Sequence, residues 1–132
     1  MTPMKFFPVL ILISLLTVEI GGASLLRLLT SDSDLSDFKE QFFRAGHAHA
    51  GVLLILSLVY FVYLDHTGFS EQTQWLTGGA LALGVLAQSG GFFLHLALGE
   101  EGEASAGTAL TIGGGVLIAI ALATLAYGLA RA

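Results

Sequence analysis

The 132-residue sequence contains no cysteine and few charged side chains. Without cysteine, neither a disulfide framework nor a thiolate metal site can form, so histidine, carboxylate or backbone groups would have to hold any metal ion. Charged residues make up only 11% of the chain, and the net charge is −5. No basic patch is present to meet phosphate groups, and we therefore expect no nucleic-acid partner.

Apolar residues are abundant instead. They account for 55% of the sequence, and the mean hydropathy is +0.82. This composition leaves too little polar surface to coat a soluble globule of this length. The sequence therefore predicts an integral membrane protein, which we expect in the inner (plasma) membrane of a prokaryote.

Four apolar segments are long enough to cross about 30 Å of hydrocarbon as helices. They are residues 6–29, 45–64, 75–98 and 106–130. The first is too long for the apolar core of a signal peptide, so we expect a retained helix. Polar segments separate the four, and the first of these, TSDSDLSDFKEQFF, is expected to be a loop or a short surface helix. The sequence predicts an all-α four-transmembrane-helix bundle that forms one membrane domain over residues 1–132.

A few ionisable or amide side chains interrupt the apolar segments. With four spans in up-and-down order, His47, His49 and His95 are expected within roughly 3–8 Å of the membrane face that carries the acidic loops. Glu19 and Gln88 are expected about 15 Å below that face. A carboxylate at this depth is unfavourable, so Glu19 needs a partner or a protonated state. Its role is either a structural hydrogen bond or part of a functional site.

Helical spacing predicts which of these groups share a face. Gln88 and His95 are seven residues apart and lie on the same side of the third helix as the nearby glycines 84 and 91. His47 and His49 are two apart and point about 200° away from each other. Small residues flank His49 on both sides, in the run HAHAG, and leave room beside its ring for a large ligand.

The fourth helix carries no charge and no histidine before its C-terminal end. Small residues recur there every four positions, at Gly107, Thr111, Gly115, Ala119 and Ala123. Such a stripe lets another helix approach closely, either within the chain or in a neighbouring subunit. Because four helices of this size make a slim bundle, a large cofactor would sit at a subunit interface.

The residues RAGHAHAG after a long polar loop, and GGALALGVLAQSGGFFLHLALG in the next span, resemble a family of small four-helix membrane proteins. This family includes hydroxylaminobenzene mutase and styrene oxide isomerase. The resemblance covers most of the chain in helix count and loop order, and its most specific element is Ala48-His49-Ala50-Gly51. In the isomerase branch, the histidine of this motif is the axial ligand of a haem b held between the subunits of a trimer, whose iron acts as a Lewis acid on an epoxide oxygen.

The resemblance implies that His49 ligates haem b in a homotrimer. The residues predicted to contact the haem are His49, Gly51, Leu53, Gly91, Phe93 and His95, and His47 or His95 is a candidate second axial ligand. Two positions depart from the family, since Ile55 replaces an asparagine and Phe93 a tyrosine. A ligand and an apolar pocket suffice for haem. We therefore expect the cofactor, and leave its use open among epoxide or hydroxylamine rearrangement, gas binding and electron transfer.

Three other interpretations stay open. His47, His49 and His95 with Glu19 suit a copper or zinc ion, since both bind neutral imidazole. The segment LLTVEIGGASLL is similar to the first helix of small multidrug resistance proteins, which predicts a Glu19-dependent transporter. Short hydrophobic chains also serve as accessory subunits of larger membrane complexes. The partners we expect are the lipid bilayer, further copies of the chain and a small-molecule ligand.

Overall fold

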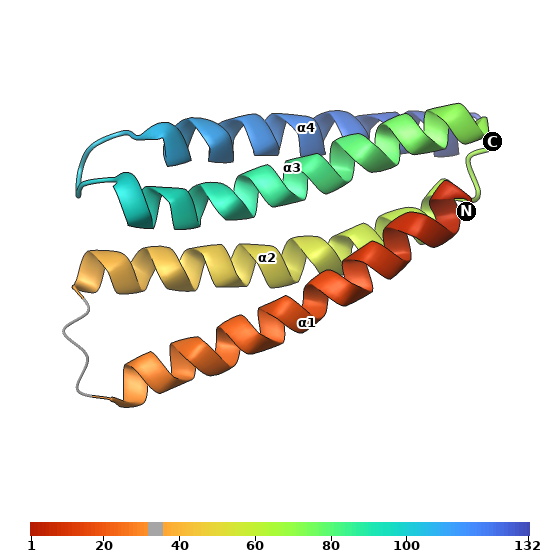
Figure 1. Cartoon of the computed structure of the whole chain (residues 1–132). Helices are drawn as coiled ribbons and strands as arrows, with labels where there is room; N and C mark the ends of the chain where they lie inside the picture. The colour runs from red at the N-terminus through yellow and green to blue at the C-terminus, as the bar shows by residue number, and fades with distance from the viewer. Residues whose placement is uncertain (32–35) are drawn as a thin grey trace.

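The computed structural model describes residues 1–31 and 36–132, and in this part the chain forms four long helices in up-and-down order (Figure 1). They are α1 (Pro3–Thr30), α2 (Asp37–Leu64), α3 (Glu71–Leu98) and α4 (Ala106–Leu129). Each is long and apolar enough to cross a membrane. The predicted bundle of four transmembrane helices is confirmed, and the protein is an integral membrane protein.

Helix α2 begins at Asp37, well before the predicted start at residue 45. The Ser36 side chain accepts a hydrogen bond from the Lys39 amide, and Asp37 and Glu40 lie in the first turn, where the helix dipole favours acidic groups. Residues 37–43, predicted as a loop or short surface helix, therefore extend the membrane helix with charged turns. Residues 32–35 of that predicted loop lie outside the described residues.

Helices α3 and α4 approach each other through bare backbone. A Cβ atom placed on Gly91 would lie 2.6 Å from the carbonyl oxygen of Gly107, and one on Gly107 would lie 2.5 Å from that of Gly91. The same reciprocal contact recurs at Gly84 and Gly114, at 2.9 and 2.7 Å. Because these distances leave no space for a side chain, the hairpin requires glycine at all four positions.

The buried face of α4 differs from the predicted four-residue stripe. Gly107 is buried and Thr111 half-buried as predicted, but Ala119 and Ala123 are exposed. Four residues turn a helix about 40° past a full circle, so a strict four-residue repeat drifts off one face. Alternating steps of three and four stay on it. The buried residues follow such steps, at Gly107, Gly114, Ile118, Ala121, Leu125 and Gly128. This face meets mainly α3 of the same chain, while Ala121 also contacts Tyr60 of α2 and Gly128 contacts the α2–α3 connection.

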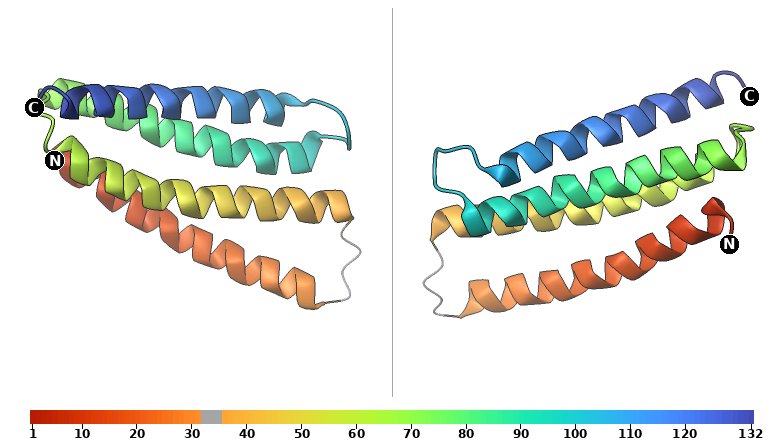
Figure 2. Two further views of the ribbon diagram at one scale, coloured as in Figure 1. Left: turned by 180° about the vertical axis from the view of Figure 1, so that it is seen from behind. Right: turned by 45° about the horizontal axis from the view of Figure 1, so that its top comes forward.

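Helix α1 joins the bundle mainly through its N-terminal part. Phe7 and Ile11 are buried, and the Phe7 ring stacks on Phe61 of α2 with centroids 5.2 Å apart. The ring of Trp75 at the start of α3 lies at the same distance from Phe7. Beyond Ile11 no residue of α1 is fully buried, and the helix diverges from α2 toward their connection (Figure 2).

Candidate functional site

His49 is held in one tautomer by its own helix. Its Nδ1 lies 2.9 Å from the carbonyl oxygen of Ala45, and because a carbonyl can only accept, Nδ1 carries the proton. The ring also packs against Phe92 of α3, with centroids 4.6 Å apart. Within residues 1–31 and 36–132, Nε2 has no hydrogen-bond partner. His49 therefore presents an oriented ring with a free lone pair on Nε2.

His47 faces the opposite side of α2. A Cβ atom on Gly22 of α1 would lie 3.3 Å from the His47 ring, and one on Gly21 would lie 3.4 Å from it. The two glycines thus leave room for the imidazole between α1 and α2. The predicted divergence of His47 and His49 is confirmed, because His47 faces α1 while His49 packs against α3.

His95 links the end of α3 to the start of α4. It is buried, and its Nδ1 lies 2.6 Å from the hydroxyl oxygen of Ser105, which caps α4. The Phe42 ring of α2 covers it, with centroids 4.4 Å apart. Ser105 was not among the residues predicted from the sequence, although SAGT at residues 105–108 has the spacing of a helix cap.

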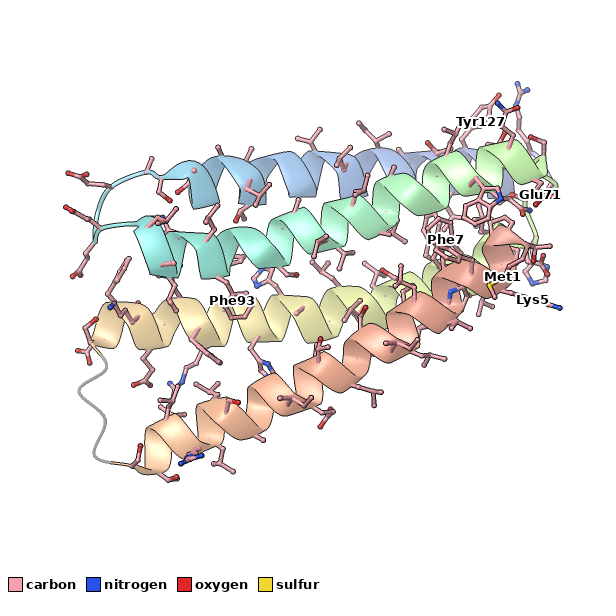
Figure 3. All side chains as sticks on the ribbon, in the orientation of Figure 1. Met1, Lys5, Phe7, Glu71, Phe93 and Tyr127 are labelled. Carbon is pink, nitrogen blue, oxygen red and sulfur yellow. The ribbon has the colours of Figure 1, made fainter. Side chains whose placement is uncertain are left out.

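The other residues predicted to contact haem lie on different surfaces. Gly91 is buried in the α3–α4 contact, whereas a Cβ atom on Gly51 would meet Val18 of α1 at 3.6 Å. Leu53 packs against the apolar core. Phe93 is 37% exposed and lies between α2 and α3, close to Phe43 (Figure 3). One chain thus gathers none of them around a single cavity with His49.

The polar groups of the bundle also separate. Among the described residues, no three His, Asp or Glu side chains come close enough to share a metal ion. Gln88 and His95 do share the face of α3 that meets α4, as predicted, and the Thr111 hydroxyl donates to the Gln88 carbonyl oxygen at 3.3 Å. The copper or zinc site proposed from the sequence is therefore not assembled within the described part of one chain.

Glu19 lies exposed near the middle of the apolar segment of α1. Its neighbours Leu16 and Ile20 are 62% and 67% exposed, so this side of the helix faces outward. An ionisable group at mid-membrane is unfavourable against lipid. Glu19 therefore needs either a proton or a covering group from outside the chain.

A groove between α1, α2 and α3 is a further feature, which the sequence did not predict. It encloses about 420 Å³ and reaches Ala50 and Phe93, the chain neighbours of His49 and Phe92. His49 itself does not line the groove. The groove and the Nε2 atom of His49 are thus adjacent but separate surfaces.

Comparison of the chain with models of known protein families, with curated proteins and with solved structures finds no match in any of the three. The function must therefore follow from the side chains themselves. The candidates for it are the Nε2 atom of His49, the exposed Glu19 and the groove between α1, α2 and α3.

Proposed function

We propose that the protein is a haem b-binding protein of a prokaryotic inner membrane, with His49 Nε2 as an axial ligand. The observation that carries this proposal is the hydrogen bond from His49 Nδ1 to the Ala45 carbonyl oxygen. Histidines that ligate metals generally donate their other ring N–H in this way, which fixes the tautomer and the ring orientation. The resemblance of the Ala-His-Ala-Gly motif favours the same residue.

The surroundings of His49 fit a porphyrin on the outer side of α2. Ala48 is small and exposed, and Val52 and Leu56 are 66% and 36% exposed. Val52 and Leu56 follow His49 by three and seven residues, so they share its side of the helix. An imidazole beside an uncharged, apolar surface satisfies the basic needs of haem. Because this surface is open in one chain, a second copy would supply the other wall.

Glu19 supports an assembly of several chains, and we propose a homotrimer from the resemblance. Contact between copies along α1 would remove the Glu19 carboxyl group from lipid. The chain lacks cysteine, so single cysteines can test this contact in native membranes. Oxidation should cross-link Ile20→Cys far more readily than Ile112→Cys, since both positions are exposed but only the first adjoins Glu19. Equal cross-linking at both positions would argue against an interface at α1.

Haem iron, when bound, supplies a Lewis acid that can polarise the oxygen of an epoxide or hydroxylamine. The chain contributes an imidazole that the Ala45 carbonyl orients and that Phe92 restricts in rotation. Ile55 and Phe93 offer no group that could hold or move a proton. We therefore propose haem binding itself as the function. Isomerase-like chemistry is the enzymatic activity that the resemblance adds to this proposal.

Absorption spectra of the detergent-purified protein from haem-sufficient cells test the proposal. We expect a Soret band, in the oxidised and dithionite-reduced states, that is lost in His49→Ala and kept in His66→Ala, whose side chain is exposed between α2 and α3. A Soret band that is shifted rather than lost in His47→Ala or His95→Ala would identify the second axial ligand. A featureless spectrum of the unaltered protein would overturn the proposal and favour an accessory subunit that co-purifies with larger partners.

A further inference from the structure

The groove between α1, α2 and α3 has the size of a small-molecule site. Its volume of about 420 Å³ lies within the usual range for ligand pockets. No charged side chain lines it, and the walls come from all three helices, including Ile11, Val18, Leu54, Val85 and Phe93. Burying a charge against such a lining is costly, so the groove favours a neutral occupant.

Four hydroxyl groups line this groove, and three of them are already bonded. Ser14, Thr17 and Ser57 each donate to a carbonyl oxygen of their own helix, at 2.8, 2.6 and 2.7 Å. Serine and threonine in helices commonly satisfy themselves in this way. The hydroxyl protons of these three side chains are therefore directed at the backbone of their own helices.

Ser89 is the exception. It is only 7% exposed, and its Oγ is buried without a hydrogen-bond partner in the part of the chain that the structure describes. A buried hydroxyl is unfavourable when it stays unpaired, and the hydrocarbon core offers no water to pair with it. Because Ser89 lines the groove, a rotation about its Cα–Cβ bond brings this unpaired donor to the apolar wall.

The depth of Ser89 distinguishes a small molecule from a lipid. The apolar part of α3 extends from Trp75 to Leu98, and Ser89 lies within about 4 Å of its midpoint along the helix axis. The polar groups of phospholipids lie at the borders of a core about 30 Å thick. An acyl chain can fill the groove but brings no acceptor to Ser89.

We propose that the groove binds a neutral, mainly apolar molecule with one hydrogen-bond acceptor, a ketone or ether oxygen, to which the Ser89 hydroxyl donates. This site is separate from the haem ligand at His49 and does not depend on it. Its occupant reaches the groove laterally, between α1 and the rest of the bundle, where α1 diverges from α2 (Figure 2).

Benzophenone is a suitable probe, because it is an apolar ketone that cross-links to nearby C–H bonds under ultraviolet light. We expect the full-length protein in phosphatidylcholine vesicles to be labelled on peptides that line the groove. Ser89→Ala should weaken labelling about 3- to 10-fold, the value of one hydrogen bond. The control Ser24→Ala, an exposed α1 serine that donates to the Ile20 carbonyl oxygen, should leave labelling unchanged.

Two further measurements separate this proposal from its rivals. Diphenylmethane has the same two rings as benzophenone but no carbonyl group. As a competitor of photolabelling it should be at least 3-fold weaker than unlabelled benzophenone. Ala82→Phe should fill the groove and abolish labelling while the protein elutes as before in size exclusion. Equal competition by diphenylmethane would mean that the groove takes any apolar chain. Either that result or full labelling of Ser89→Ala would overturn the proposal.

Discussion

Helices α3 and α4 are the most extensively packed pair of the bundle, whereas α1 is anchored mainly at its N-terminal end. In the first pair, glycines face carbonyl oxygens at two levels. In the second case, an aromatic cluster around Phe7 carries most of the contact, and beyond Ile11 the residues of α1 are half-buried or exposed up to residue 31. The groove, His47 and Glu19 all belong to the loosely packed side.

This difference shows that apolar character alone does not determine which helices pack together in a membrane. Lipid tails are as apolar as leucine, so an apolar face gains little by leaving lipid, and close backbone contact decides which helices associate. The α3–α4 pair has that contact. Helix α1 is rich in large apolar side chains but has no such close backbone contact beyond Ile11. This leaves space for a ligand or a second copy of the chain.

The largest expected effect is at the glycine contact. Gly91→Val should lower the free energy of unfolding by about 3 kcal/mol, because the added side chain meets the Gly107 carbonyl oxygen and forces the helices apart. Gly113→Val is the matched control, since nothing lies within 4 Å of a Cβ atom there. Thermal unfolding in detergent measures both. Similar losses for the two variants would contradict a tight α3–α4 scaffold.

Next in size is the link between His95 and Ser105. His95→Ala should cost about 2 kcal/mol, because it removes a buried hydrogen bond of 2.6 Å and leaves a cavity under Phe42. Ser105→Ala should cost about 1 kcal/mol through the lost cap of α4. His66→Ala, which changes an exposed side chain, should be neutral in the same unfolding assay. If His95→Ala were also neutral, the link would carry no stability.

A smaller loss is expected where α1 is anchored. Phe7→Ala should cost about 1 kcal/mol, since aromatic contacts are lost but lipid can solvate the exposed surface. Because Trp75 lies 5.2 Å from the Phe7 ring, its fluorescence should change as α1 loosens. Leu16→Ala, on the outward face of α1, should alter neither signal. An unchanged Trp75 spectrum in Phe7→Ala would mean that other contacts hold this end.

The sequence predicted the four spans because hydrocarbon thickness sets a minimum helix length, which apolar runs reveal directly. It also predicted the divergence of His47 and His49, which depends only on helix geometry. The start of α2 was missed because the Ser36 cap acts outside the apolar run. Within one chain only the N-terminal part of the four-residue stripe on α4 is packed, because Ala119 and Ala123 are exposed; whether a neighbouring subunit covers them stays a prediction.

The features of the site that the sequence did not predict depend on contacts between helices or on a single side-chain rotamer. Whether Ser89 bonds its own helix or faces a groove is decided by its rotamer, and no pattern of residues encodes that choice. The bond between His95 and Ser105 joins two helices across a turn. Haem ligation by His49 stays a prediction, to which the structure adds an oriented imidazole.

The smallest expected effect is at the contact between His47 and α1. A Cβ atom on Gly22 would lie 3.3 Å from the His47 ring, so Gly22→Ala requires a shift of a few tenths of an ångström. Since α1 is free to move at this end, we expect a loss of at most about 0.5 kcal/mol, offset in part by the better helix propensity of alanine. The comparable change in the glycine contact, Gly107→Ala, meets backbone that cannot yield and should cost several times more. Equal losses for these two alanine variants in thermal unfolding would show that α1 is held as firmly as α4.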